Sequence, residues 1–91
     1  MAIFVIIAST NAEKLKAAVV AQYGANHYEF STSSWFVPDS GSTKDVADKL
    51  GLTGGVVGAQ GVVTKMTAYS GWAASAGWTF LGQHPEAVPN G

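Results

Sequence analysis

The sequence contains no cysteine and no arginine, and only 12% of its 91 residues are charged. Without cysteine it has no disulfide, no thiolate nucleophile and no cysteine-bound metal site, which suits a reducing compartment. Five lysines against six acidic residues give a net charge of -1, so no general attraction to long nucleic acids or anionic membranes is expected. The longest apolar run, Ala2–Ala8, is too short to span a bilayer, and no basic segment precedes it. These absences predict a cytoplasmic protein.

The low number of charged residues also means that part of the surface of a single subunit must be apolar. Hydrophobic residues make up 47% of the chain, whereas an ordinary soluble domain has about 25% charged residues to place on its surface. A chain of this length is expected to bury only about 60–65% of the surface that it exposes when unfolded. We therefore expect some apolar surface to be buried between subunits of a homo-oligomer.

Periodicity and capping residues predict six main elements in the order strand, helix, strand, strand, helix, strand. The first strand is apolar on both faces, and the second helix is expected to be capped by Ser42 with Asp45 in its first turn and to end at Gly51. The expected bounds are a strand over Ala2–Ala8, a helix over 11–23, strands over His27–Thr32 and Trp35–Pro38, a helix over 43–50, and a strand from Val62 to about Tyr69.

This order predicts an α+β fold of the ferredoxin-like βαββαβ type, in which both helices cover one face of a four-stranded antiparallel sheet. A short helix over Trp72–Leu81 follows, so residues 1–82 form the domain and residues 83–91 a flexible tail. The other sheet face is left open. The pattern places Trp35, Val37, Lys65, Thr67 and Tyr69 on it, or their neighbours if the register shifts by one residue.

Most catalytic and metal chemistry has no support in this sequence. His27 and His84 have no acidic residue at a metal-binding spacing, and no nucleophile-elbow glycine pattern surrounds a serine. The glycine-rich segment Gly51–Gly61 lacks the Gly-Lys-Ser/Thr ending of a phosphate-binding loop. We therefore predict no catalytic residue, no metal site and no cofactor.

Two features remain as candidate ligand groups. Ser42, Thr43 and Lys44 begin a predicted helix, where free backbone N–H groups, hydroxyls and one ammonium can bind an anion, although ordinary capping explains them as well. All three tryptophans lie at or after position 35, where they either fill a core and a subunit interface or stack on a flat ligand such as a base.

The chain also resembles a family of small, largely uncharacterised bacterial and phage proteins over about residues 2–82. The residues that carry the resemblance are Trp35-Phe36-Val37, Gly41-Ser42-Thr43-Lys44-Asp45-Val46, Lys49-Leu50-Gly51, Tyr69-Ser70-Gly71-Trp72-Ala73 and Trp78. In size and layout it is more distantly similar to phage proteins that sequester cyclic nucleotide immune signals. That similarity implies sequestration of a signal as an anti-defence function.

The leading hypothesis is a non-catalytic homo-oligomeric protein that encloses a small nucleotide-like ligand between subunits. Aromatic rings would stack on bases, and lysines or helix N-termini would face phosphates; the residues expected to do so are Trp35, Thr43, Lys44, Tyr69 and Trp72. The alternative is a structural or protein–protein interaction module that docks a partner through its open sheet face. A small monooxygenase-like or tautomerase-like enzyme is a third hypothesis, and its tautomerase version lacks an N-terminal proline.

Overall fold

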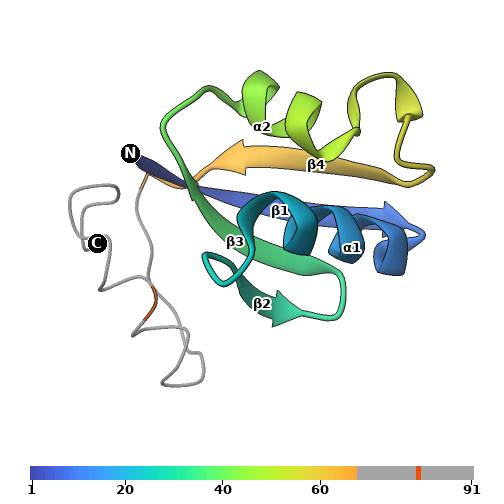
Figure 1. The fold of residues 1–91 in the computed structure, drawn as a ribbon, viewed down its shortest axis with the longest axis horizontal. Helices are drawn as coiled ribbons and strands as arrows, with labels where there is room; N and C mark the ends of the chain where they lie inside the picture. The colour runs from blue at the N-terminus through green and yellow to red at the C-terminus, as the bar shows by residue number, and fades with distance from the viewer. Residues whose placement is uncertain (68–79, 81–91) are drawn as a thin grey trace.

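The computed structural model describes residues 1–67 and residue 80, and in that part of the chain the elements follow the predicted order. They are β1 (Ala2–Thr10), α1 (Ala12–Tyr23), β2 (Tyr28–Ser31), β3 (Ser34–Asp39), α2 (Thr43–Leu50), the 3-10 turn η1 (Thr53–Gly55) and β4 (Gln60–Lys65), as Figure 1 shows. The last strand begins two residues earlier than expected. Tyr69, the helix predicted over Trp72–Leu81 apart from Phe80, and the tail 83–91 lie outside the described residues.

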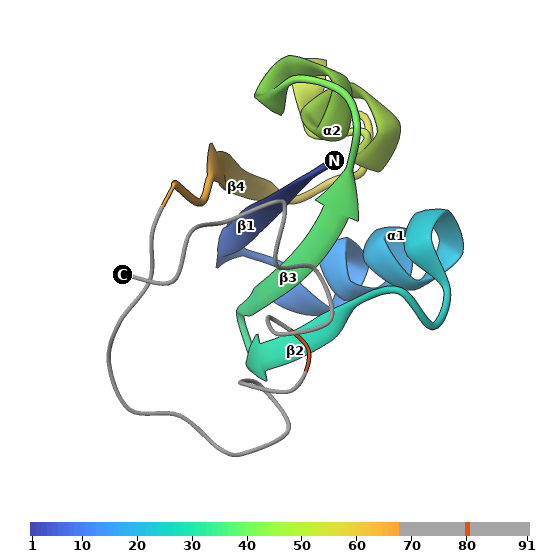
Figure 2. The same cartoon turned by 90° about the vertical axis from the view of Figure 1, so that its left-hand side faces the viewer.

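The four strands form one sheet in the order β2-β3-β1-β4, and every neighbouring pair is antiparallel. Strands β1 and β3 lie in the centre, so the most apolar segments have a hydrogen-bonded neighbour on both sides. Both helices lie on the same side of the sheet (Figure 2), which leaves its other side without a helix. The domain is thus a small α+β fold, as predicted.

Helix α2 begins and ends where its sequence indicates. The Ser42 hydroxyl accepts a hydrogen bond from the Asp45 backbone N–H at 3.1 Å, and the Asp45 carboxylate accepts one from the Ser42 N–H at 2.8 Å. This reciprocal pair satisfies two backbone donors that a helix start otherwise leaves without a partner. Gly51, with φ of 75°, ends the helix in a left-handed conformation that other residues adopt only with strain.

Helix α1 packs its apolar stripe on the sheet through Leu15 and Val19, which are both fully buried. The strand β4 approaches this helix at Gly61, where a β-carbon would lie 2.5 Å from the Ile7 carbonyl oxygen and 3.2 Å from Leu15. A residue without a side chain is therefore required for this close packing of β1, β4 and α1. Neither described helix is long and apolar enough to cross a membrane.

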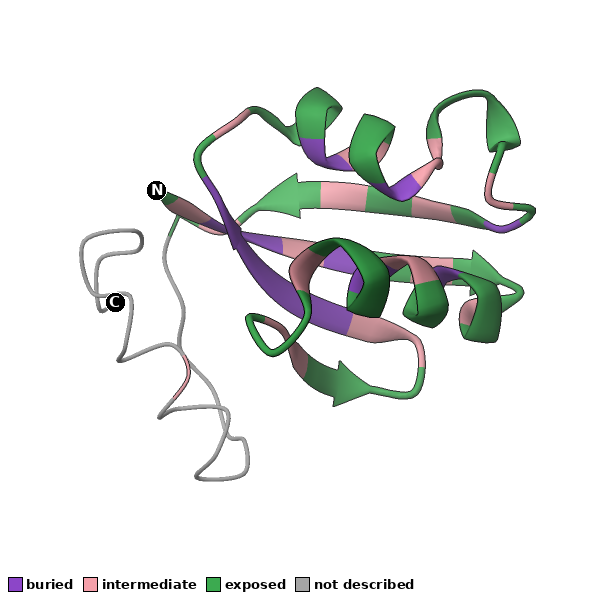
Figure 3. Ribbon diagram, viewed as in Figure 1, coloured by how far each residue is buried: buried purple, intermediate pink, exposed green. Residues whose placement is uncertain are grey.

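The main core lies between the sheet and the two helices (Figure 3), and its largest buried side chain is Trp35. The buried members come from β1, α1, β3, α2 and the residue just before β4: Phe4, Ile6, Leu15, Val19, Trp35, Val37, Val46, Leu50 and Ala59.

Our prediction that Trp35, Val37 and Lys65 lie on the open face is wrong. Trp35 pairs with Ile6 of the adjacent strand, and Val37 and Lys65 both pair with Phe4. Directly paired residues project from the same side of a sheet, and Phe4 and Ile6 are buried under the helices. The alternative register, in which their neighbours face the open side, is the one that the sheet adopts.

Candidate functional site

The predicted ligand residues do not come together in the described part of the chain. Trp35 lies in the core with a fully buried side chain, whereas Thr43 and Lys44 lie exposed in the first turn of α2. Tyr69 and Trp72 lie outside the described residues. A ligand at the surface of this fold has no access to Trp35, so the predicted stacking role of that residue does not fit its position.

The first turn of α2 is already supplied with negative charge by the protein itself. The Asp45 carboxylate occupies the helix start in the capping pair with Ser42. The Lys44 ammonium binds Asp48 at 2.8 Å, and this hydrogen bond and the charge of Asp48 raise the pKa of Lys44. Since an acidic side chain is favourable at a helix N-terminus, ordinary capping explains this segment without a bound anion.

The Trp35 indole N–H meets no acceptor at hydrogen-bonding geometry, although the side chain is fully buried. Glu29, the residue paired with Trp35 on β2, has its carboxylate 3.2 Å from the Lys16 ammonium. That lysine is the main cause of the lowered pKa of Glu29, and the nearby indole contributes in the same direction. The Glu29 carboxylate is therefore paired mainly with Lys16 of α1.

Sequence analysis missed a buried polar cluster around Asp39, at the end of β3. The carboxylate is only 3% exposed and accepts hydrogen bonds from the Lys49 ammonium at 2.7 Å, the Tyr23 hydroxyl at 2.8 Å and the Gly41 backbone N–H at 2.8 Å. Burial acts to raise the pKa of Asp39, but these three donors outweigh it and the pKa is lowered. The cluster links α1, β3 and α2, and all carboxylate oxygens have partners, so it stabilises the fold and leaves no free catalytic group.

Because of Tyr23, we expect the stability of the folded protein to decrease at alkaline pH. Burial, and then the hydrogen bond to Asp39 and its negative charge, raise the pKa of Tyr23 above its ordinary value of 10. The unfolded chain therefore releases this proton before the folded one does, and stability is lost as pH rises above about 10. We expect urea unfolding to show a steeper loss of stability between pH 9.5 and 11 in the parent protein than in Tyr23→Phe; parallel pH profiles would contradict this expectation.

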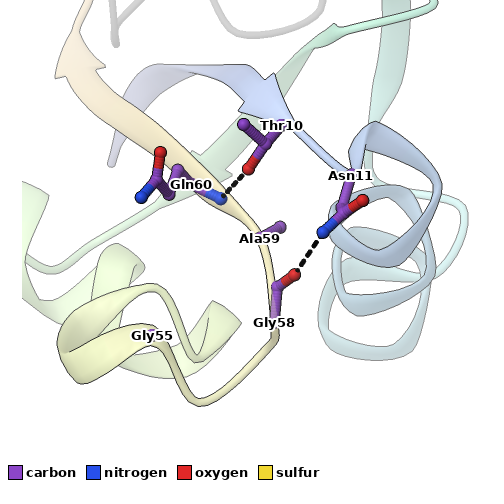
Figure 4. Close-up of a pocket in the computed structure, with 6 residues that line it drawn as sticks. All are labelled: Thr10, Asn11, Gly55, Gly58, Ala59 and Gln60. Atoms are coloured by element: carbon purple, nitrogen blue, oxygen red, sulfur yellow. Dashed lines mark hydrogen bonds between the residues drawn. The ribbon is translucent and has the colours of Figure 1, made fainter.

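A surface hollow of about 440 Å³ lies where β1 ends, α1 begins and the loop enters β4. Figure 4 shows the residues that line it: Thr10, Asn11, Gly55, Gly58, Ala59 and Gln60. Its two best-placed polar side chains already bind the loop, because Asn11 donates to the Gly58 carbonyl at 2.8 Å and Thr10 accepts from the Gln60 N–H at 3.0 Å. Both side chains are thus already engaged in hydrogen bonds within the protein.

The side of the sheet away from the helices, which we call the open face, is mostly apolar and carries no charged residue at its described strand positions. Paired register and ring contacts assign to it Ile3, Val5, Ile7, Tyr28, Phe30, Ser31, Ser34, Phe36, Pro38, Val62 and Thr64.

One end of the open face is covered and the other is exposed. Ile3 and Phe36 are buried, with Tyr28, Met66 and Phe80 packed beside them. Toward the other end, the side chains of Ile7, Phe30 and Val62 remain 44%, 49% and 57% exposed. The Phe30 ring stacks on Phe36 with centroids 5.0 Å apart. Exposed apolar side chains gathered on one face, without charges among them, are typical of a surface that binds something.

Neither a known protein-family model nor any curated protein matches this sequence. The resemblance to small bacterial and phage proteins therefore stays a prediction. Within the described residues, no group of three or more histidine and acidic side chains is arranged to hold a metal ion. Among the described surfaces, the open face is the one whose chemistry is not accounted for by contacts within the domain.

Proposed function

We propose that this protein is a non-catalytic interaction domain that docks a partner protein on its open face. The observation that carries this proposal is the row of half-exposed apolar side chains, Ile7, Phe30 and Val62, on a sheet face without charges. Covering a half-exposed apolar side chain contributes about 1 kcal/mol, so the three together favour binding by about 3 kcal/mol before other contacts are counted. A partner protein with a similarly apolar surface can pack against this face without removing any charged side chain of the face from water.

A photocrosslinking experiment tests where this protein is contacted in cells. We expect p-benzoylphenylalanine in place of Thr64, an exposed position on the open face, to give a discrete crosslinked protein product. The matched control places the same group at Val20, which is similarly exposed but lies on α1. Equal product from both positions, or product only from position 20, would show that the open face is not the docking surface.

We also infer that the chain path is of the ferredoxin-like type. The element order strand, helix, strand, strand, helix, strand and the sheet order β2-β3-β1-β4 support this assignment. The cytoplasm is the compartment that we propose, because a chain without cysteine gains nothing from an oxidising environment.

Sequestration of a nucleotide-like ligand, such as a cyclic nucleotide immune signal of a phage-infected cell, is the second candidate function. Phe30 favours it, because its half-exposed ring stacks on Phe36 and rings on a sheet face are suited to stacking on bases. Its weakness is that no described cation lies on the same face to meet phosphates. Native mass spectrometry with cyclic di- and trinucleotides tests it, and a ligand retained in integer ratio would place it ahead of the docking function.

A further inference from the structure

We propose that the partner on the open face is a second copy of this chain, packed face to face about a two-fold axis that runs parallel to the strands. This inference rests on the proposed function and names its partner. An interface of this kind uses the same patch on both copies, so the patch must be complementary to itself.

The distribution of charge favours a second copy over a partner with a charged surface. All five lysines and the five described acidic residues lie on the helices or on the helix side of the sheet; Lys65 and Glu29, the two charged residues in edge strands, pair with Phe4 and Trp35 of the core. Two open faces therefore meet without repulsion between like charges. A partner that brought charged side chains would bury them against a face that offers no counter-charge, which is unfavourable.

The sizes of the side chains determine the orientation. Pairing register puts Val62, Ile7 and Ser34 in one row across β4, β1 and β3. On β2 the row ends where the register shifts: Ser31 pairs with Ser34, and Phe30, the extra residue of the shift, lies beside it. An axis parallel to the strands reverses the row, so that Phe30 meets the partner's Val62 and Ile7 meets the partner's Ser34. Large residues then face small ones, and the gap between the sheets is even.

An axis perpendicular to the strands gives a poorer fit. Phe30 would meet the partner's Phe30 while Val62 met the partner's Val62, so the sheets would be held apart on one side and leave a gap on the other. Packed sheets keep a distance of about 10 Å along the whole contact, which the first arrangement allows.

The dimer is expected to be weak. Six half-exposed apolar side chains, three from each copy, become covered in this contact, whereas association loses translational and rotational freedom. Other contacts across the face, including those of Val5 and Tyr28, add to the balance. We therefore expect a dissociation constant of about 10–500 μM, so that monomer and dimer are both present at the concentrations used in solution experiments.

Sedimentation velocity between about 5 and 500 μM tests the proposal on the full chain. We expect the parent protein to shift from monomer to dimer over this range. Phe30→Lys and Val62→Glu should each remain monomeric, because each introduces a charge into the apolar contact. Val20→Lys is the matched control on α1, with an exposed valine replaced by lysine away from the open face, and it should dimerise like the parent.

Mixing the two monomeric variants tests the axis. In the proposed orientation the introduced ammonium meets the introduced carboxylate, while the second contact keeps the original Val62 and Phe30, so a mixed dimer should form. A mixture of the two variants that stays entirely monomeric would overturn the orientation. A parent protein that stays monomeric at 500 μM, or a dimer that neither variant disrupts, would overturn the second copy as partner. Crosslinking at position 64 to a different protein would then leave the docking function standing.

Discussion

Asp39→Ala is expected to destabilise the domain by about 3 kcal/mol, which lowers the melting temperature by roughly 10–20 °C in a chain of this size. The substitution removes the acceptor of three hydrogen bonds at once and leaves the Tyr23 hydroxyl and the Lys49 ammonium without a partner. The Lys49 side chain is about half exposed and can reach water, which keeps the expected loss below that of a fully buried ion pair. Urea unfolding monitored by circular dichroism measures the effect.

Two further variants separate the contributions to this cluster. Asp39→Asn keeps an acceptor for the Gly41 N–H but loses the charge that faces Lys49, so about half of the destabilisation is expected. Lys44→Met, which breaks the exposed pair with Asp48, is the surface control and should leave the unfolding curve unchanged. An Asp39→Ala variant as stable as this control would contradict the structural role of the cluster.

Trp35→Ala is expected to destabilise the domain by about 3–5 kcal/mol, because it removes the largest fully buried side chain of the main core. The total stability of a domain of this size is only about 5–13 kcal/mol, so a measurable fraction of this variant should be unfolded at 37 °C. Thermal and urea unfolding followed by far-ultraviolet circular dichroism report the loss without depending on tryptophan fluorescence.

Trp35→Phe is the informative comparison for this position. It keeps an aromatic ring in the core and removes an indole N–H that has no hydrogen-bond partner, so we expect a loss of no more than about 1.5 kcal/mol. If Trp35 instead served as a ligand-stacking residue, Trp35→Ala would weaken nucleotide binding and leave the unfolding curve unchanged. That result would contradict both the core position and the expected loss of stability.

The order and type of the elements could be predicted because local features determine them. The capping pair of Ser42 and Asp45, the stop at Gly51 and the apolar stripe through Leu15 and Val19 all act within a few residues of one another. The same holds for β1, whose apolar run forms a central strand. Such local features predict where an element begins and ends, and they place two helices on one side of a sheet.

Local features could not predict which residues of each central strand face the helices and which lie on the open face. Residues Ile3–Ile7 of β1 and Trp35–Pro38 of β3 are apolar at every position, so alternation does not distinguish the helix side from the open side. The one charged residue of β3, Asp39, would ordinarily mark the exposed side. It instead faces the helices, because Tyr23 and Lys49 bind it there.

The Asp39 cluster was missed because its members come from three elements far apart in the sequence. Tyr23 ends α1, Asp39 ends β3 and Lys49 lies in the last turn of α2, and no short motif joins them. The start of α2 was considered a candidate anion site because the sequence places two hydroxyl groups and a lysine there. Asp45, which supplies the negative charge that such a helix start favours, was recognised only as a capping residue.

Gly61 limits how this protein can change over evolution. Any β-carbon at this position meets the backbone of Ile7 and the side chain of Leu15, so a substitution must either separate β4 from β1 or displace α1 from the core. Neighbouring Gly54 and Gly55 have open space around them and are limited only by their backbone angles. In related sequences, therefore, we expect changes to be easiest to accommodate in the loop around residues 54 and 55, whereas the close approach of Gly61 to Ile7 and Leu15 has to be kept.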